Sequence, residues 1–466
     1  MDFREETVEG LVRQVRRREI GVRELVAAAL ERIASIDGEL GAFVAVDEAG
    51  ALAAAEALDR RLAVGEEAPP LAGIPIGVKD LEDAAGLRTT HGSVFHADDP
   101  PATADSILVA RLKAAGCIVL GKTNTPEHGC KAHTSNGIGP PTRNPWNPQR
   151  TAGGSSGGTA AALAAGLVPL GTGSDGGGSI RIPSALCGIT GFKPSLGRVP
   201  SGGDKPPGWP DVSTKGVMAR RVRDIATACD QVVAPDPTDP ASLPMPREPW
   251  RPGLEDLHPP ARVGWSATLG YAPVDPEVRR VCEAAVERLA ALGTEVVEVP
   301  TVFEADPMEA WFTWVGAANM RTFGHLRGTP DWERIDPDLR FGIDWVVDLG
   351  PDRVIAARDA MHRDAVALAR TLADVHLLLT PTVAARTPAI DEWGVLDGQP
   401  EANWIRFTYP FNSTRSPAGT VCAGLDGDGL PVGLQVVGPQ HGDVAVLRLL
   451  AVLEDELGSF APPSPV

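Results

Sequence analysis

The chain has 466 residues, of which 43% are hydrophobic and 22% are charged, and its formal net charge at pH 7 is −18. This length is enough to bury a large core, and the composition is typical of a soluble globular protein. The negative charge argues against nucleic acid or an anionic membrane as the main partner, because both require a basic surface.

The cysteines and the first residues indicate neither a metal ribbon nor secretion. None of the six cysteines belongs to a C-x-x-C pair, and Cys117 and Cys187 lie in apolar surroundings typical of a core. Residues 1–6 are charged, unlike a signal peptide, and no apolar run approaches the length of a membrane span. We therefore expect reduced thiols and a cytoplasmic location.

Helical patterns dominate the first part of the chain, residues 7–70. Residues 7–35 predict two helices that begin near Thr7 and Gly21. In the second helix, apolar residues recur at helical spacing, at Leu25, Ala28, Ala29 and Ile33.

A helix followed by a strand is predicted further along. Asp105 is expected to cap this helix and Gly116 to end it, and residues 117–120 then predict a buried strand. The apolar stripe of the helix is formed by Ile107, Leu108 and Leu112. Alternation of strand and helix predicts an α/β architecture with a largely parallel sheet.

The second half of the chain begins with a proline-rich stretch. Residues 235–260 contain nine prolines, so we interpret them as a surface connection rather than a core element. Residues 275–292 then predict a helix, residues 295–299 a strand, and residues 377–382 another buried strand.

Six of the ten tryptophans lie between Trp311 and Trp404. The spacing of Trp311 and Trp314 fits one face of a helix, which favours core packing. The alternative is an aromatic wall around a substrate channel.

Residues 151–194 hold two glycine-rich loops that each contain a serine, at 153–158 (GGSSGG) and 176–179 (GGGS). An alanine-rich segment of helical character separates them. Glycines beside a serine let the backbone approach a substrate closely and direct its N–H groups inward. Two such loops, with Ser155 and Ser179 24 residues apart and no catalytic histidine nearby, indicate a serine hydrolase with another kind of base.

Lys79 is the candidate for that base. Residues 73–80, GIPIGVKD, predict a short strand that ends at this lysine. Lysine has an ordinary pKa of about 10.4, so it acts as a base at neutral pH only when it is desolvated or crowded by positive dipoles. The apolar strand would bury Lys79, and we therefore expect activity to rise toward alkaline pH.

These three motifs together, with the second loop extended to GSDGGGSIRIPS, resemble the amidase signature family of Ser–Ser–Lys amidohydrolases. Further blocks match in the same order at 121–127 (GKTNTPE), 143–146 (RNPW) and 429–439 (GLPVGLQVVGP), so the resemblance covers most of the chain. It implies one α/β/α domain over residues 1–466, with a twisted, mixed central sheet of about eleven strands flanked by helices. Residues 71–200 would form the signature core, and no metal or organic cofactor is implied.

The resemblance assigns a catalytic triad. Ser179 would be the nucleophile, and Ser155, preceded by a cis peptide bond, would relay protons between Ser179 and the base, Lys79. The oxyanion hole would be formed by backbone N–H groups of Gly176, Gly177, Gly178 and Ser179.

Polar residues beside the nucleophile are expected to support it. Asp175 and Arg181 would pair and brace the loop, while Thr172 and Ser174 would add hydrogen bonds. The alternative is that they are ordinary polar residues at the end of a strand.

Other catalytic classes fit less well. Residues 154–158 match the G-x-S-x-G elbow of α/β-hydrolases, but residues 143–151 are polar and contain proline, so no strand is expected before the elbow, and no HGGG motif occurs. Neither loop is followed by G-K-[ST], which argues against a phosphate-binding loop. The absence of S-x-x-K and H-E-x-x-H argues against penicillin-binding enzymes and metallohydrolases.

Two alternatives remain within the family. One is the glutaminase subunit of a tRNA-dependent amidotransferase, which requires a partner, although residues 198–207 do not resemble the corresponding segment of that subunit. The other is a non-catalytic binding relative, although all three catalytic positions are intact. Otherwise a homodimer is the default oligomeric state.

The expected reaction is hydrolysis of linear amide C–N bonds, with carbamates (urethanes) and esters as related substrates. Specificity would depend on variable segments at 121–142, 202–213 and 301–404. The tryptophans favour an apolar or aromatic small-molecule substrate. Arg321 and Arg327 could bind a substrate carboxylate, but we interpret them as solvated surface residues.

Overall fold

A computed structural model describes residues 1–204 and 206–463. One sheet contains, in spatial order, β1 (Phe43–Val46), β3 (Ile118–Thr123), β2 (Pro75–Lys79), β6 (Leu170–Asp175) and β8 (Thr214–Ala219). A second sheet contains β10 (Glu295–Glu298), β9 (Arg262–Trp265), β11 (Leu378–Pro381), β15 (Pro431–Val437), β14 (Ala418–Leu425) and β7 (Gly191–Lys193). Two separate hairpins are formed by β4 (Arg143–Asn144) with β5 (Asn147–Thr151), and by β12 (Gly394–Leu396) with β13 (Gln399–Glu401).

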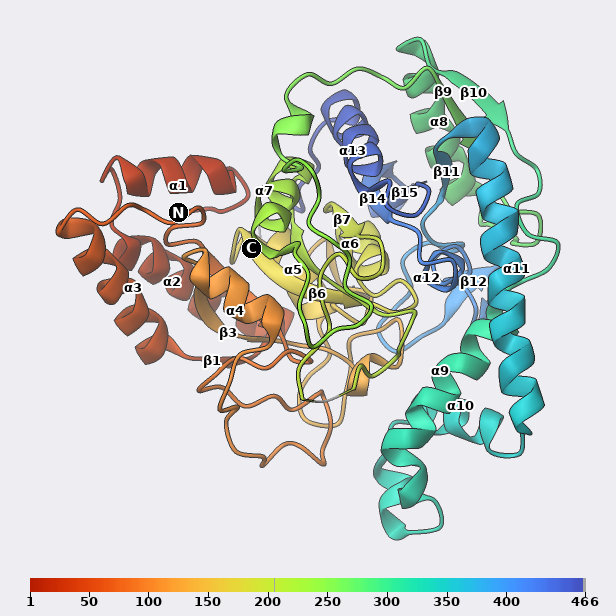
Figure 1. Ribbon diagram of the computed structural model, residues 1–466, viewed down its shortest axis with the longest axis horizontal. Coiled ribbons are helices and arrows are strands. Elements are labelled where there is room, and N and C mark those ends of the chain that lie inside the picture. Colours follow the sequence, from red (N-terminus) through yellow and green to blue (C-terminus); the bar gives the residue numbers. More distant parts are fainter. Residues whose placement is uncertain (205, 464–466) are drawn as a thin grey trace.

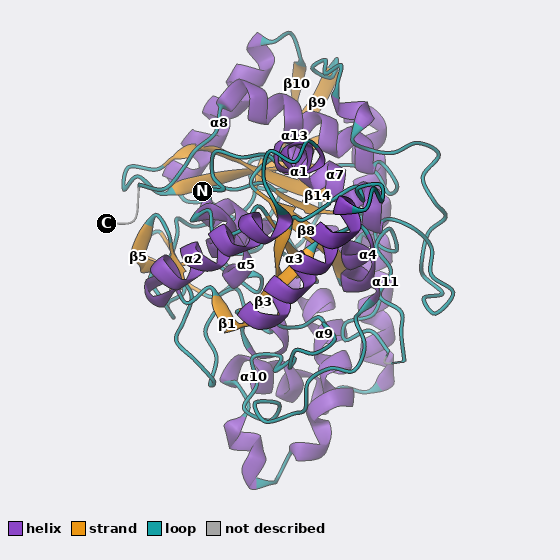
Figure 2. Cartoon of the chain, turned by 90° about the vertical axis from the view of Figure 1, so that its left-hand side faces the viewer, coloured by secondary structure: helices purple, strands orange, loops and turns teal. Residues whose placement is uncertain are grey.

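The two larger sheets meet edge to edge. A β-bridge between Thr190, next to β7, and Ala219, at the end of β8, connects them. Figure 2 shows the central strands of these sheets between helices, with β9 and β10 toward one end of the molecule. The structure therefore confirms the α/β fold class with a mixed central sheet of about eleven strands.

The largely parallel sheet predicted from strand–helix alternation is wrong. β2 runs parallel to β3 and β6, and β9 runs parallel to β10 and β11, but the other neighbours in both sheets pair antiparallel. The hairpin of β14 and β15 accounts for part of this difference, because consecutive strands joined by a short turn must pair antiparallel.

Helices surround the sheets (Figure 1). They are α1 (Val8–Arg16), α2 (Val22–Leu40), α3 (Glu48–Ala63), α4 (Ile107–Ala114), α5 (Gly157–Ala164), α6 (Arg181–Cys187), α7 (Val222–Val232), α8 (Pro276–Ala291), α9 (Met308–Phe323), α10 (Pro337–Val347), α11 (Pro351–Val375), α12 (Pro410–Ser413) and α13 (Asp443–Leu457). Short 3₁₀ helices are η1 (Glu127–Gly129), η2 (Pro252–Leu254), η3 (Gly324–Leu326) and η4 (Pro330–Arg334). Within the described residues, no helix combines the length and apolar character that crossing a bilayer requires.

The N-terminal helices start where the sequence predicts. The Thr7 side chain caps α1 by accepting a hydrogen bond from the N–H of Gly10, and Gly21 is the N-cap of α2. α2 extends to Leu40, beyond the predicted end, because its apolar face stays buried over this length.

The predicted cap of α4 is wrong by one residue. The Ser106 side chain accepts a hydrogen bond from the N–H of Val109, whereas the Asp105 carboxylate binds Lys113 Nζ at 2.6 Å and the N–H of Ala85 at 2.7 Å. The interaction with this lysine of α4 holds the acidic side chain away from the capping position.

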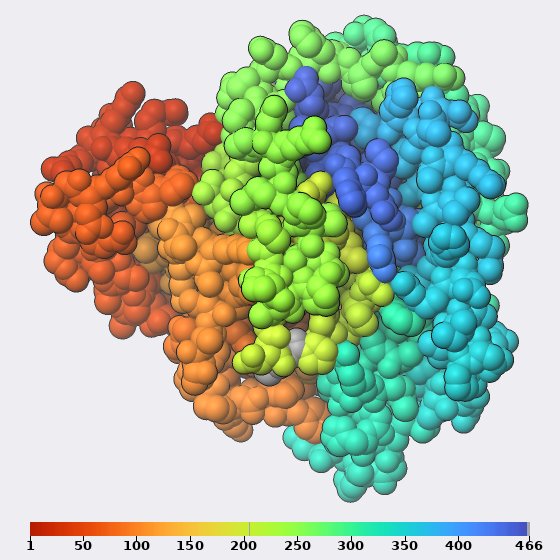
Figure 3. Space-filling model, in the orientation of Figure 1, coloured from red at the N-terminus to blue at the C-terminus, as the bar shows by residue number. Residues whose placement is uncertain are grey.

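The proline-rich segment 235–260 contains only one short helix, η2, within an extended connection from α7 to β9 (Figure 1). Its atoms form part of the visible surface (Figure 3). The predicted helix and strand that follow are present as α8, capped by Asp275, and β10. The sequence predicts no strand at 143–151, and this prediction is wrong. β4 and β5 form a hairpin there, and β5 ends two residues before the first glycine-rich loop.

Candidate active site

Two neighbouring parallel strands bring the candidate base and the nucleophile loop together. β2 ends at Lys79 and β6 ends at Asp175, and the carboxyl ends of adjacent parallel strands lie at the same edge of a sheet. The N–H of Lys79 donates to Thr172 Oγ1 at 2.8 Å, which ties the end of β2 to β6. The glycine-rich loops lie before α5 and α6, so each presents its serine close to the start of a helix.

The amine of Lys79 lies among three serine hydroxyls. Its Nζ donates to Ser155 Oγ at 2.7 Å, to Ser156 Oγ at 2.8 Å and to Ser174 Oγ at 3.0 Å, and the side chain is fully buried. The Gly154–Ser155 peptide bond is cis. The contact of Ser156 with Lys79 was not anticipated from the sequence, although its position directly after Ser155 is a signal that could have found it.

The environment of Lys79 favours the neutral amine. Burial lowers the pKa of Lys79 to about 7, although the negative charges of Asp175 and Glu82 raise it in part. At this pKa a substantial fraction of the lysine is unprotonated near neutral pH, which is the form that can accept a proton.

Ser179 is linked to the first loop through its backbone. Its carbonyl accepts a hydrogen bond from the N–H of Ser156 at 3.1 Å. The Ser179 side chain is half-buried, and its hydroxyl makes no hydrogen bond with residues 1–204 or 206–463. The hydroxyl is therefore free to contact a substrate.

The predicted oxyanion donors differ in availability. The N–H of Gly178 donates to Asp175 Oδ1 at 2.8 Å, so the carboxylate already occupies it. The N–H groups of Gly176, Gly177 and Ser179 have no acceptor in the described part of the chain. Three of the four predicted donors are thus available to a bound oxygen.

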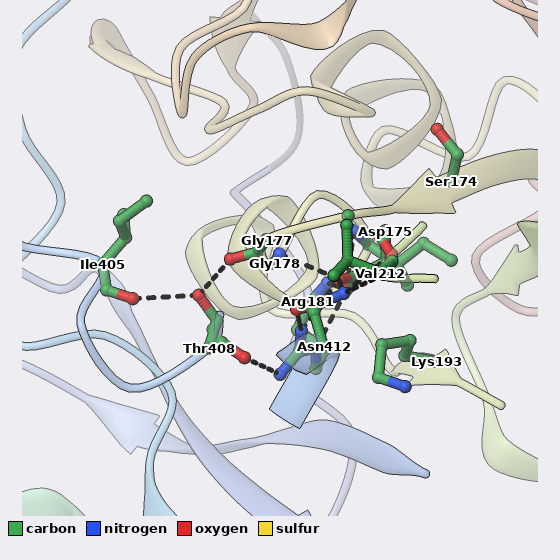
Figure 4. A network of polar contacts seen from close by, with 12 residues as sticks. Ser174, Asp175, Gly177, Gly178, Arg181, Lys193, Val212, Ile405, Thr408 and Asn412 are labelled. Carbon is green, nitrogen blue, oxygen red and sulfur yellow. Dashed lines mark hydrogen bonds and ion pairs between the residues drawn. The ribbon is translucent and has the colours of Figure 1, made fainter. Parts of the chain in front are cut away.

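Asp175 and Arg181 form a fully buried ion pair, with Arg181 Nη2 2.8 Å from Asp175 Oδ1. Burial raises the pKa of the Asp175 carboxyl, but the Arg181 guanidinium and its hydrogen bonds outweigh this effect and hold that pKa well below its usual range. The guanidinium also donates to the Thr408 carbonyl at 2.9 Å and to Asn412 Oδ1 at 2.7 Å (Figure 4). A further hydrogen bond of 2.7 Å reaches Gln435 Oε1. The pair anchors the nucleophile loop to the segment at 408–412 and to β15.

Aromatic side chains press against the glycines of the nucleophile loop. A Cβ atom on Gly176 would lie 2.5 Å from Trp209 Cε3, and a Cβ on Gly177 would lie 2.4 Å from Trp311 Cζ2. The two indoles meet edge to face with ring centroids 6.2 Å apart. Only glycine fits at these two positions, because any larger residue would displace an indole or the loop.

The two arginines considered for a substrate carboxylate have other partners. Arg321 Nη2 donates to the carbonyls of Pro207 and Gly208, and Arg327 pairs with Asp344. Within the described residues, no group of three or more histidine, cysteine or acidic side chains has an arrangement that could hold a metal ion.

A cavity of about 490 Å³ lies close to the first glycine-rich loop. His133 lines this cavity, and its backbone lies within 3 Å of where a Cβ atom on Gly154 would be. None of the candidate catalytic residues lines the cavity. Its walls carry several charges, from Glu127, Lys131, Glu333, Arg334, Asp336, Asp338 and Asp391.

A family model, curated relatives and solved structures all match most of this chain. The Amidase family model matches residues 24–447. An acylamidase from Rhodococcus erythropolis is 35% identical over 448 residues, covering 92% of this chain and 91% of the acylamidase. A glutamyl-tRNA(Gln) amidotransferase subunit from Thermus thermophilus is 36% identical over 467 residues, covering 95% of each chain. A solved bacterial aryl acylamidase of the amidase signature enzymes has a TM-score of 0.90 and 30% identity, covering 97% of this chain and 96% of its own.

Proposed function

Because this chain belongs to the amidase family, we propose that it hydrolyses linear amide C–N bonds through an acyl-enzyme on Ser179. The observation that carries this proposal is the buried Lys79 amine within hydrogen-bond distance of Ser155, in a loop that is joined to Ser179 by the hydrogen bond from the Ser156 N–H to the Ser179 carbonyl. A nucleophile, a base and oxyanion donors are the groups that amide hydrolysis requires.

In the acylation step, the Ser179 hydroxyl oxygen attacks the carbonyl carbon of the substrate. Its proton passes to Ser155, whose own proton passes to the neutral amine of Lys79. The negative charge that develops on the carbonyl oxygen is stabilised by the free backbone N–H groups of Gly176, Gly177 and Ser179. When the C–N bond breaks, Ser155 delivers a proton to the departing amine and recovers one from Lys79.

Deacylation repeats these proton transfers with water as the nucleophile. Water attacks the acyl carbon of the Ser179 ester while Ser155 and Lys79 accept its proton. The tetrahedral intermediate then releases the carboxylic acid, and the proton returns to Ser179. The relay requires a neutral lysine at the start of each half-reaction, which the lowered pKa of Lys79 supports.

The substrate class that we favour is an apolar or aryl acyl amide, with small carbamates as the second class. Trp209 is half-buried and lies against Gly176 of the nucleophile loop, and aromatic faces bind apolar and aromatic groups well. The interactions of Arg321 and Arg327 with other parts of the chain argue against their use in carboxylate recognition.

The second candidate function is that of a glutaminase subunit that works with a partner. The 36% identity to the amidotransferase subunit from Thermus thermophilus, which extends over 95% of both chains, favours it. This function predicts that native protein purifies with other subunits and that glutamine hydrolysis depends on them. The hydrolase function predicts amide turnover by the purified chain alone.

The test is hydrolysis of nitroanilides and nitrophenyl carbamates with short, long and aromatic acyl groups. Ser179→Ala is expected to abolish turnover. Ser184→Ala is the matched control, because Ser184 is also buried near the loop, on α6, and its hydroxyl has no partner among the described residues. Mass spectrometry after reaction with a fluorophosphonate should find the label on Ser179. Turnover that survives in Ser179→Ala would overturn the proposal.

A further inference from the structure

We propose that Trp311 and Thr408, which both lie outside the two glycine-rich loops, are positioning residues of the oxyanion hole: Trp311 orients the peptide group that carries the Gly177 donor, and Thr408 holds the next peptide group turned away from the substrate. This inference rests on the proposed function, since it concerns how the hole at Ser179 is held. Trp311 comes from α9, and Thr408 precedes α12, more than a hundred residues beyond the nucleophile.

Trp311 fixes the first peptide group of the loop. Its Nε1–H donates to the Gly176 carbonyl at 2.8 Å, and the indole packs over Gly177. In a planar trans peptide the C=O and the following N–H point in opposite directions. When the Gly176 carbonyl is held by Trp311, the N–H of Gly177 is therefore directed away from α9.

Thr408 fixes the next peptide group. Its hydroxyl lies 2.6 Å from the Gly177 carbonyl and 2.9 Å from the Ile405 carbonyl, and the shorter distance favours donation of its one proton to Gly177 (Figure 4). The N–H of Gly178 consequently points in the opposite direction, where it meets Asp175 Oδ1 at 2.8 Å. Thr408 thus helps to direct this donor to Asp175 and away from the substrate.

The peptide groups before and after these two are also fixed through their carbonyls. The Asp175 carbonyl accepts from Asn412 Nδ2 at 2.8 Å, and the Gly178 carbonyl accepts from the N–H of Ile182 at 2.7 Å. Each of the four backbone carbonyls of residues 175–178 therefore accepts a hydrogen bond. Three of the four donors are side chains, those of Trp311, Thr408 and Asn412. In this arrangement the N–H of Gly178 is turned to Asp175, and the N–H groups of Gly176, Gly177 and Ser179 are left without an acceptor in the described residues.

The loop needs this support because glycine has little conformational preference of its own. Gly178 has a φ of +133°, which L residues rarely adopt, and three glycines in succession can rotate at small cost. An oxyanion hole stabilises charge best when its donors are already oriented before the reaction. Side chains from a different part of the fold supply the orientation that the glycines lack.

Trp311 is itself held firmly. It is 9% exposed, it stacks on Tyr409 with ring centroids 5.2 Å apart, and it meets Trp209 edge to face. Thr408 is fully buried, and its own carbonyl accepts from Arg181. Packing therefore fixes where both side chains lie relative to the loop.

The test is Trp311→Phe, which removes the N–H donor and keeps an aromatic ring. Trp314→Phe is the matched control, because Trp314 lies on the same helix and its Nε1 donates to the Pro210 carbonyl at the same 2.8 Å. Loss of one oxyanion donor costs about 100- to 1000-fold in kcat, so we expect loss of its positioning residue to cost about 10- to 100-fold. Trp314→Phe should stay within about threefold of the wild type.

Further measurements on Trp311→Phe separate a positioning role from a purely structural one. In Trp311→Phe, KM and the pH profile should stay unchanged, while the affinity for a trifluoromethyl ketone, whose serine adduct carries an oxyanion, should fall in parallel with kcat. Equal kinetics of Trp311→Phe and Trp314→Phe would overturn the inference. A wild-type protein that hydrolyses no amide or carbamate would instead overturn the proposed function.

Thr408 supplies a second pair of variants if Trp311→Phe does not fold. Thr408→Val keeps the shape and loses the hydroxyl, whereas Thr408→Ser keeps the hydroxyl. We expect Thr408→Val to lose kcat and ketone affinity together and Thr408→Ser to retain both. Equal losses in the two variants would contradict a role for the hydroxyl donor.

Discussion

The Nζ atom of Lys79 lies 2.7 Å from the Oγ atom of Ser155, at the end of a strand whose residues are all buried. Burial disfavours the charged form of the lysine, and the serine provides a path for its proton. The same feature that would be unfavourable for a structural lysine therefore suits a general base, and it sets the pH range in which the proposed reaction can proceed.

The first prediction concerns this pH range. Lys79 accepts a proton only when it is neutral, so kcat/KM should rise with pH and level off above an apparent pKa near 7. The measurement is a pH–rate profile on one nitroanilide substrate. A flat profile between about pH 6 and about pH 9 would contradict the assignment of Lys79 as base.

The second prediction separates the two adjacent serines. Ser156→Ala removes one of three hydroxyls around the lysine amine but leaves the relay through Ser155, so we expect kcat to fall about tenfold. Ser155→Ala interrupts the relay and should cost several orders of magnitude. Ser184→Ala again serves as the buried control. Equal losses for Ser155→Ala and Ser156→Ala would mean that the relay is not specific to Ser155.

The sequence predicts residues that belong to short recognisable motifs better than the contacts that other residues make across the fold. The order of Lys79, Ser155 and Ser179 and the pairing of Asp175 with Arg181 follow from short motifs, and the structure brings these residues into one site. Their catalytic roles stay predictions. The α/β class follows from the same motifs, because the family resemblance covers most of the chain.

Other contacts depend on packing between distant segments. Thr408 and Asn412 lie more than 200 residues from the loop that they hold, and no periodic pattern predicts such a meeting. The antiparallel strand pairs could not be predicted for a similar reason, because alternation of strand and helix along the chain does not determine which strands pair or in which direction. The prediction for the cap of α4 is wrong because Asp105 and Ser106 are adjacent and both are residue types that cap helices. The ion pair of Asp105 with Lys113 leaves Ser106 as the cap.

The third prediction concerns the buried pair beneath the nucleophile loop. Arg181→Met leaves the Asp175 carboxylate buried without its guanidinium, so the free energy of unfolding should fall by about 3–5 kcal/mol. Arg223→Met is the control, because it removes a similar two-bond pair with Asp455 at the surface and should cost about 0–1 kcal/mol. Urea unfolding of the two variants measures the difference. Equal destabilisation would show that burial does not determine the effect.

The fourth prediction uses Lys193, a fully buried lysine at the end of β7 whose Nζ donates to the Pro194 carbonyl at 3.1 Å. Burial and the positive charge of Arg181 lower the pKa of Lys193 to about 7, although Asp175 and Asp443 raise it in part. In the unfolded chain a lysine titrates near pH 10.4. Between these two pKa values the unfolded state binds more protons than the folded state, so this lysine makes stability rise with pH.

Replacing Lys193 should therefore stabilise the protein most at low pH. Below about pH 7, Lys193 is protonated in the folded and in the unfolded chain, and the folded state bears the full free-energy cost of the buried charge. Lys193→Met should therefore raise the free energy of unfolding by about a few kcal/mol in this pH range. The gain should shrink as the pH approaches about 10, where the lysine is neutral in the folded state and loses its charge in the unfolded state as well. Urea unfolding near pH 6, pH 8 and pH 10 measures this trend, with Lys113→Met on the partly exposed side of α4 as the control. A gain that stays constant across this range would show that lost packing or hydrogen bonding, and not the buried charge, governs the effect of Lys193.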